Sequence, residues 1–460
     1  MHQAINVGKD LFSSDVVAKS LTTGYDINPG TMVDGGAIRR ESLSNEITQL
    51  SFSLADFTMA TAIAKVPTQS PVEQYDIMTS YGNNSRTGFS REMGISPIND
   101  VSIQRKNVNM KHLSDTRRIA TVLGRMGNTN IVDPIAMETE AGILQLYSVI
   151  EDTIFYGDAD LTADAQGQGL EFDGLAKLVD KDNVIDMRGE TLTEQALNNG
   201  SILIRKAFGH PNVVFMPVET KSLFVNEQLT RQVVIQPSAS IIKSGFDVDG
   251  FQSTSGALQL YSSTIMGRNQ MLNEADGMHA NAPIAPSKVE ASVVTKQEAL
   301  FTDEDVASDL LEYKVIVKAE SGQSLAVDGS VKLDAKDSAV KLAVEVPAVF
   351  NAQPTHIEVY RKALNGQFYL IQSVAFRDAV LSGNVYKIEA TDKNEKIPGT
   401  TDVFIAEMNR DVMGLFELGG MSRTPLAQID ASQTFTIEWW GALYLKNPKR
   451  VAHLKNVRAM

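Results

Sequence analysis

The sequence contains no cysteine among its 460 residues. Disulfide bonds, thiolate zinc sites and cysteine nucleophiles are therefore excluded. No uninterrupted apolar stretch reaches the roughly 18 to 20 residues that a membrane-spanning helix needs, and the first residues lack the apolar block of a secretory signal. We therefore expect a protein that is made in the cytoplasm and has no membrane partner.

Positive charge is also in short supply. Lys and Arg number 42 against 56 Asp and Glu, which gives a formal net charge of -14 at pH 7. A surface that grips nucleic acid needs clustered cations to neutralise phosphates. Gripping nucleic acid is therefore not expected to be the main task, whereas lying beside packed DNA without adhering to it would suit this charge.

The motifs of common enzymes are missing as well. The sequence has no phosphate-binding Gly-x-x-x-x-Gly-Lys-Ser/Thr, no His-Glu-x-x-His and no Gly-x-Ser-x-Gly. Its six histidines are scattered at spacings unlike those of metal sites, and the stretch Asp247-Val248-Asp249-Gly250 matches only the start of a calcium loop. We expect no enzymatic activity, no cofactor and no bound metal.

What is present is an ordinary folded composition, with 43% apolar and 21% charged residues. The length favours two or three domains. Residues 1 to about 45 have turn signals and little periodicity, which indicates an arm or a frayed terminus. Residues 68 to about 113 predict a long two-stranded excursion that carries Arg86, Arg91, Arg105 and Lys106.

Helices and strands alternate irregularly after this excursion. Asp133-Pro134 is a good helix start, and apolar residues at helical spacing predict a long helix from Pro134 to Tyr156 that ends at Gly157. A second helix is expected from Thr193 to Phe208, a strand from Val213 to Met216 and a third helix from Val218 to Leu229. This order favours an α+β fold.

The composition changes at Ala282-Pro283-Ile284-Ala285-Pro286, which predicts a stiff linker. Two of the strands that follow, His356 to Arg361 and Phe368 to Val374, flank the turn signal Asn365-Gly366 and predict a hairpin. Short strands of this kind over residues 284 to 400 favour an inserted all-β immunoglobulin-like or fibronectin-like sandwich. The other expected strands are Val289 to Val294, Tyr313 to Ala319, Val340 to Val346 and Val385 to Glu389.

Apolar strands return after Pro398-Gly399, so residues 46 to 281 and 401 to 460 are expected to form one body. Alternation in a strand should bury one of Trp439 and Trp440 and expose the other. The last segment, Lys446 to Arg458, has no acidic residue. We interpret it as a basic tail that meets either DNA or acidic sister subunits, and we favour sister subunits.

The stretch from Gly169 to Leu178 resembles the major capsid proteins of Twort-like and related contractile-tailed phages of Gram-positive bacteria. Further matches follow the same order along nearly the whole chain. They are Thr22-Thr23-Gly24-Tyr25, Gly36-Ala37-Ile38-Arg39-Arg40-Glu41, Lys111 to Thr116, Phe155-Tyr156-Gly157-Asp158, Phe215-Met216-Pro217, Val359-Tyr360-Arg361, Pro425-Leu426-Ala427-Gln428-Ile429 and Trp440-Gly441-Ala442-Leu443.

This resemblance implies the Hong Kong 97-type capsid fold, which has an N-terminal arm, an extended loop, a peripheral domain and an axial domain. The expected segments would then fill these parts, and the sandwich would decorate the outer surface. The arm would be 1–45, the extended loop about 68–113, the spine helix about 134–156, the axial domain about 190–281 and the inserted sandwich 284–400.

The resemblance also implies a function. Copies of the chain would form hexamers and pentamers of an icosahedral phage head around double-stranded DNA, without sequence-specific DNA binding. Portal, scaffold and head-maturation protease are the implied partners, and Lys19-Ser20 matches a processing junction. The protein would be made in the host bacterial cytoplasm and reside in the virion. Candidate contacts between subunits are Arg86, Arg91, Arg105, Lys106, Lys449 and Arg450.

Two alternatives stay open from the residues alone. The chain could be another self-assembling phage component, such as a contractile tail sheath, which would form tubes. It could also be a surface adhesin that uses its immunoglobulin-like module for binding, although the missing secretory signal disfavours this.

Overall fold

A computed structural model describes residues 53–80, 82, 92–94, 100–125, 133–164, 167, 169–228, 249–267, 270–278, 281–295, 297–307, 310–428 and 430–459. The predicted arm lies outside these residues, as do the junction at Lys19 and Ser20 and the two arginines Arg86 and Arg91. The expectations for these positions therefore stay predictions.

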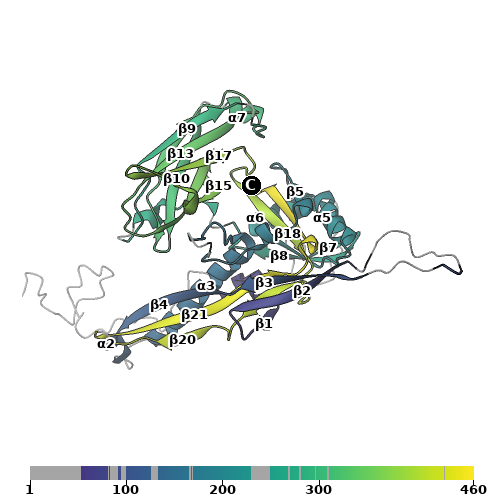
Figure 1. Ribbon diagram of the computed structural model, residues 1–460, viewed down its shortest axis with the longest axis horizontal. Helices are drawn as coiled ribbons and strands as arrows, with labels where there is room; N and C mark the ends of the chain where they lie inside the picture. The colour runs from purple at the N-terminus through teal and green to yellow at the C-terminus, as the bar shows by residue number, and fades with distance from the viewer. Residues whose placement is uncertain are drawn as a thin grey trace, which may run out of the picture. The chain divides into compact units, whose positions relative to one another are not determined.

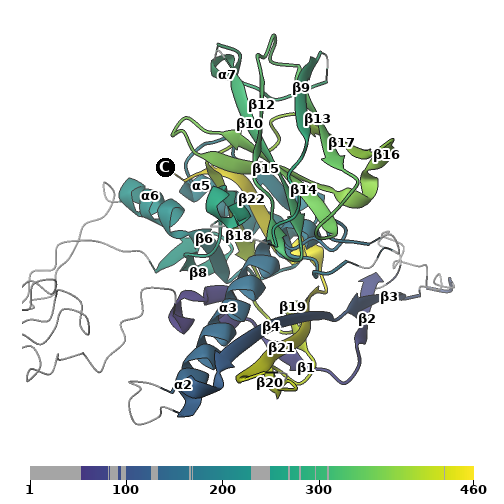
Figure 2. The ribbon, with the colours of Figure 1, turned by 90° about the vertical axis from the view of Figure 1, so that its left-hand side faces the viewer.

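The longest helix, α3, spans Pro134–Tyr156, as the Asp133-Pro134 start predicts. The Asp133 side chain accepts a hydrogen bond from the Ile135 amide at 3.0 Å, and the helix ends at Gly157. The helix lies along strands β4 and β21 (Figure 2). Gly142 permits this close approach, because a Cβ there would lie 2.5 Å from Cδ1 of Ile437.

The sheet under α3 is built around the long strand β21. Trp439 is 1% exposed and Trp440 is 37% exposed, which confirms the predicted alternation. On the open face, the ring of Trp440 contacts the ring of His112 on the neighbouring strand, with centroids 4.4 Å apart and the planes tilted by 35°. The strands are β1 (Lys65–Pro67), β4 (Lys111–Ala120), β19 (Met413–Glu417), β20 (Ser422–Pro425) and β21 (Ser432–Leu445).

A second sheet has the order β5-β22-β18-β6-β8-β7 and mixes parallel with antiparallel pairs. Its strand β22 corrects the prediction of a basic tail. Val451 and Leu454 are fully buried, and Lys455 pairs with Asp186 inside the chain. The strands are β5 (Val184–Asp186), β6 (Val213–Pro217), β7 (Gly250–Ser253), β8 (Gly256–Ser263), β18 (Thr400–Ala406) and β22 (Val451–Arg458).

Two helices accompany this sheet. α5 spans Glu194–Lys206 and has the predicted Thr193 cap, which accepts a hydrogen bond from the Ala196 amide. α6 spans Val218–Gln228. Among the described residues, no helix is long and apolar enough to cross a membrane. The shorter helices are η1 (Leu54–Asp56), α1 (Thr58–Ala62), α2 (Thr121–Arg125), α4 (Leu175–Leu178), η2 (Lys181–Asn183), η4 (Glu274–Met278), α7 (Asp303–Ala307), η5 (Phe376–Asp378) and η6 (Pro448–Arg450).

Residues 288 to 392 form two antiparallel sheets that share one core. Val315 of one sheet and Val344 and Ile388 of the other belong to this core. The predicted hairpin is β14–β15, and Gly366 in its turn has a φ of 81° that favours glycine. The sheets contain β10 (Leu311–Ala319), β11 (Gly322–Gln323), β12 (Val327–Val331), β14 (Pro354–Lys362) and β15 (Phe368–Ala375), and β9 (Lys288–Val294), β13 (Ala339–Pro347), β16 (Val380–Ser382) and β17 (Val385–Asp392).

The predicted excursion begins and ends in a two-stranded ribbon (Figure 1). Its strands are β2, Val72–Ser80, and β3, Ser102–Asn109, and they pair only with each other among the described strands. The return strand β4 begins at Lys111 and belongs to the sheet under α3. We refer to β2 and β3 as the ribbon.

The carboxylate of Glu151, in the buried face of α3, joins three segments of the chain. It accepts hydrogen bonds from the backbone amides of Met59 and Ala60, at 3.0 and 2.5 Å, and from the hydroxyls of Thr58 and Ser263, at 3.2 and 3.4 Å. Burial raises the pKa of Glu151. Because an unpaired buried amide is costly, this carboxylate holds α1 and the end of β8 against α3.

Replacing Glu151 by Leu should lower the free energy of unfolding by about 2 to 4 kcal/mol, because two buried backbone amides lose their acceptor. Urea unfolding followed by tryptophan fluorescence measures the effect, since Trp439 lies in the same core. Glu140→Leu, at an exposed position of α3, is the matched control and should change stability little. Equal effects of the two variants would contradict this role of Glu151.

Candidate functional site

The two faces of the ribbon differ in exposure, because Gln74, Asp76 and Met78 of β2 are exposed on one face and Glu73, Tyr75 and Ile77 are partly buried on the other. On one face, Arg105 donates to both carboxylate oxygens of Asp76, at 2.8 and 3.1 Å. This hydrogen bond lowers the pKa of Asp76. On the same face, Met78 lies opposite Ile103, and these side chains are 50% and 60% exposed. Lys106 lies on the other face, opposite Tyr75.

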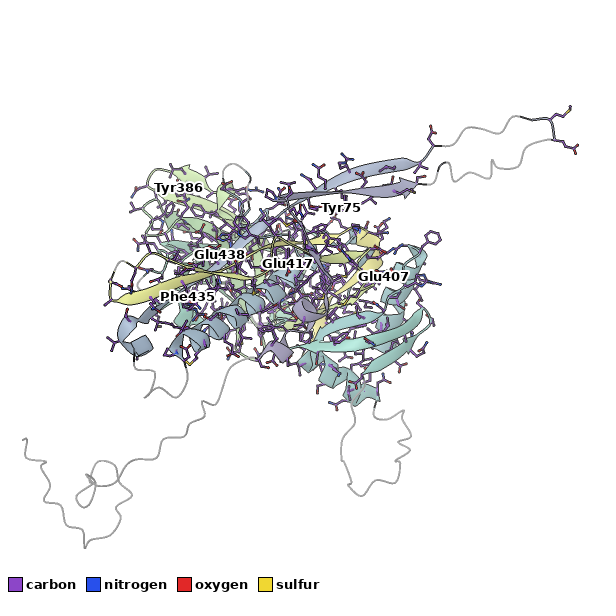
Figure 3. The ribbon with its side chains drawn as sticks, turned by 90° about the horizontal axis from the view of Figure 1, so that it is seen from below. Tyr75, Tyr386, Glu407, Glu417, Phe435 and Glu438 are labelled. Carbon is purple, nitrogen blue, oxygen red and sulfur yellow. The ribbon has the colours of Figure 1, made fainter. Side chains whose placement is uncertain are left out.

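The base of the ribbon is fastened to the core of the chain. Tyr75 and Val108 pack against the core under α3, and Figure 3 shows Tyr75 where the ribbon leaves this core. Burial raises the pKa of Tyr75. A two-stranded ribbon is only marginally stable in water. Beyond this base, the ribbon therefore keeps apolar side chains exposed to solvent.

A hollow of about 1300 Å³ lies at the base of the ribbon. Charged side chains of both signs line it, among them Lys106 and Asp160, and Pro448 lines it from the other end of the sequence. Lys449 follows Pro448 directly. Lys106 and Lys449 are both predicted contact residues. The structure thus places Lys106 at the hollow and Lys449 next in sequence to a residue that lines it.

Arg450, a further candidate, pairs with a buried carboxylate of its own chain. Nη1 of Arg450 lies 3.2 Å from Oε1 of Glu407, which is buried and also accepts a hydrogen bond from the His210 amide. Lys449 is exposed, and its ammonium lies 4.0 Å from Asp180. Arg105 and Lys106 are therefore the described candidates that share one exposed strand.

The segment from Gly169 to Leu178, which carries the most specific sequence motif, closes the end of α3. The amide of Gly174 donates to the carbonyl of Gly157, and Phe172 packs against Trp439. A Cβ on Gly174 would lie 2.6 Å from the carbonyl oxygen of Thr153. The motif is therefore a packing device that needs glycine for close contact.

Lys177 in this motif sits among three carboxylates. Its ammonium lies 2.5 Å from Asp158, 2.6 Å from Asp160 and 2.8 Å from Asp173. Partial burial alone would lower the pKa of Lys177, but the hydrogen bonds to these carboxylates raise it. The bond from Lys177 lowers the pKa of Asp160. Sequence reasoning missed this cluster, although the i, i+4 spacing of Asp173 and Lys177 is a signal for one of the pairs.

In the part of the chain that the structure describes, no group of His, Asp and Glu residues is arranged to hold a metal ion. The acidic run at Asp303 to Asp305 begins the short helix α7. The candidate functional feature is the surface of the ribbon, which exposes cations and apolar side chains.

Comparison with known proteins gives near and distant similarities. The capsid of a native GTA particle has a TM-score of 0.48 at 7% identity, over 94% of this chain and 100% of that one. A chain of Microbacterium phage Oxtober96 has a TM-score of 0.46 at 9% identity, over 94% of this chain and 99% of that one. No protein-family model matches the sequence.

The near similarities are in sequence. The major capsid proteins of Staphylococcus phage K and Staphylococcus phage S25-3 are each 41% identical to this chain over 452 residues, which cover 98% of this chain and 96% of theirs. A relative from Enterococcus phage phiEF24C is 40% identical over 463 residues, which cover 100% of this chain and 98% of that relative. These similarities extend over nearly the full length of both partners.

Replacing Lys177 by Met should lower the free energy of unfolding by about 1 kcal/mol at pH 7, because the three carboxylates lose their cation. The pKa of Asp160 is lowered in the folded state, so its stabilisation is present above the ordinary carboxyl range and is lost as the pH falls. The difference between the two proteins should therefore shrink as the pH falls from about 5. Urea unfolding at several pH values measures it.

Lys181→Met, at a nearby exposed position, is the control and should leave stability and its pH dependence unchanged. A constant difference between the Lys177 variant and the unchanged protein from pH 7 to about 3 would contradict an electrostatic role for Lys177.

Proposed function

Because the chain belongs to the family of phage major capsid proteins, we propose that its copies form the hexamers and pentamers of an icosahedral head around double-stranded DNA. The protein is a major head protein of the virion, with a structural and not an enzymatic role. The tail sheath and adhesin alternatives are set aside, because these relatives are capsid proteins.

We assign the parts of the chain to a Hong Kong 97-type fold. The ribbon belongs to the extended loop of about 68–113, α3 is the spine helix, and residues 190–281 contribute most of the axial domain. Residues 284–400 are an inserted sandwich of immunoglobulin-like or fibronectin-like type. Two antiparallel sheets around one core support the sandwich, and continuous sheets built from residues before and after it support one body of 46–281 plus 401–460.

The ribbon is the proposed contact between subunits, and its exposure is the observation that carries the proposal. A two-stranded ribbon with exposed Met78 and Ile103 gains stability when a neighbour covers these side chains. Arg105 and Lys106 add cations, and sister subunits with a net charge of -14 offer acidic surface. Such charges select and orient partners more than they add affinity.

Other parts of the proposal extend this picture. Arg86 and Arg91, which lie between the two strands of the ribbon in sequence, would meet acidic residues of the same neighbour, and Lys449 would contribute at the base. The sandwich would face outward, away from the DNA. Portal, scaffold and a head-maturation protease acting at Lys19-Ser20 are the further proposed partners, and synthesis would take place in the host cytoplasm.

The combined variant Arg105→Glu with Lys106→Glu should reduce the yield of closed shells at least about tenfold, because reversed charges then face acidic neighbours. Electron microscopy and sedimentation of the expressed protein, under conditions in which the unchanged chain assembles, measure the yield. Circular dichroism should show that the variant subunit stays folded, since the Arg105 and Asp76 side chains are 67% and 49% exposed and a surface pair of this kind contributes little to stability.

The combined variant Lys332→Glu with Lys336→Glu is the matched control. It makes the same change in charge at exposed positions of the sandwich and should assemble normally. Normal shells from the ribbon variant would sink the proposed contact, and so would equal defects in both variants.

A further inference from the structure

Three residues with unusual backbone conformations gather where the sandwich joins the rest of the chain. Arg188, Asn394 and Asn456 have φ angles of 50°, 59° and 56°, in the left-handed region. Asn tolerates this region, but Arg rarely adopts it. Such a conformation persists where the surrounding contacts impose it.

The guanidinium of Arg188 connects the body to the sandwich. It donates one hydrogen bond to the carbonyl of Asn394 at 3.1 Å and another to the carbonyl of Leu300 at 2.6 Å. Its own backbone is fixed on the body side, because the Arg188 amide donates to the carboxylate of Asp186 at 3.1 Å. The amide of Gly189 donates to the carbonyl of Asn456 at 2.8 Å.

Asn456, in the buried strand β22, holds the segment that leaves the sandwich. Its side chain is 2% exposed. The side-chain carbonyl accepts from the Ile397 amide at 2.9 Å, and the side-chain amide donates to the carbonyl of Glu395 and the carboxylate of Asp186, both at 2.8 Å. We refer to Asp186, Arg188, Asn394 and Asn456 as the clamp.

The clamp continues into the interior of the sandwich. Asn394 donates its backbone amide to Asp392 at 2.8 Å. The guanidinium of Arg361, a residue that is 2% exposed, donates hydrogen bonds to the carboxylate of Asp392 and to the side-chain carbonyl of Asn394, both at 2.5 Å. Tyr313 donates to Asp392 at 3.0 Å. A buried ion pair of this kind adds little stability, but it is sensitive to geometry and can specify one arrangement.

The segment that leads into the sandwich is also held. Met271 forms a β-bridge with Tyr369, and the Leu272 amide donates to the carbonyl of Phe368 at 2.9 Å. Gln323 donates to the carbonyl of Asn273. These contacts precede the predicted stiff linker at 282–286, so the chain touches the sandwich before that linker begins.

We propose that the clamp and this incoming segment fasten the sandwich to the body in one fixed orientation, so that the sandwich is not an appendage on a flexible tether. Arg188 is the positioning residue, because its guanidinium reaches the sandwich and its exit segment together. The inference concerns the single chain and does not depend on shell assembly. In a shell, it would make every copy present the same face of its sandwich.

The absence of cysteine allows a direct test in the full-length chain. Cysteines introduced at the exposed positions Lys206, in α5, and Lys332, in the sandwich, carry spin labels for distance measurement by electron resonance. The otherwise unchanged chain should give one narrow distance distribution. In the same labelled chain, Arg188→Ala should broaden it, and the Ile397 amide should exchange hydrogen at least about tenfold faster, as expected when a charged hydrogen bond is lost.

Two further variants keep the test specific. Arg188→Lys retains the charge but has no planar fork to reach two carbonyls, so it should broaden the distribution as well. Lys341→Ala removes a cation that pairs with Glu389 within the sandwich, and it should leave the distribution narrow. A broad distribution in the otherwise unchanged chain would overturn the fixed orientation. A narrow one in both folded Arg188 variants would overturn the role of Arg188.

Discussion

The buried carboxylate of Glu151 is the constraint on which the body of this protein depends. It satisfies the amides that start α1 and also receives a hydroxyl from the end of β8, so one side chain of α3 fixes segments that lie about ninety residues before it and more than a hundred after it. Burial raises its pKa, which means that the hydrogen bonds must offset a real cost of desolvation. The helix thereby becomes the element against which the remaining parts are placed.

The body buries its large apolar side chains within its own core, whereas the ribbon does not. The core under α3 buries large aromatic side chains such as Phe155 and Trp439, but β2 and β3 leave apolar side chains such as Met78 and Ile103 exposed to water. This exposure suits a capsid protein, because a second copy of the chain can cover the exposed side chains of the ribbon. The sandwich differs from the ribbon, because polar contacts of the segments before and after it fasten it to its own chain.

Local signals explain what could be predicted from the sequence. The Asp133-Pro134 start of α3, the Thr193 cap of α5 and the Asn365-Gly366 turn act within a few residues, and the structure has each of them. The prediction of a basic tail was wrong for strand β22, because its apolar residues are interspersed with basic ones and the basic ones decided the interpretation. The clamp and the Lys177 cluster escaped prediction, since they join residues that only the fold brings together. The family was predicted from motifs that match in order along the chain, and periodicity and composition alone could not have identified it.

A cryo-electron microscopy map of assembled shells tests the central claim most directly. The account predicts that the ribbon of each copy lies on the surface of a neighbouring copy, with Met78 and Ile103 covered and with Arg105 and Lys106 facing acidic side chains of that neighbour. A map in which the ribbon folds back onto its own chain, or stands free in solvent while the shell is closed, would contradict the account.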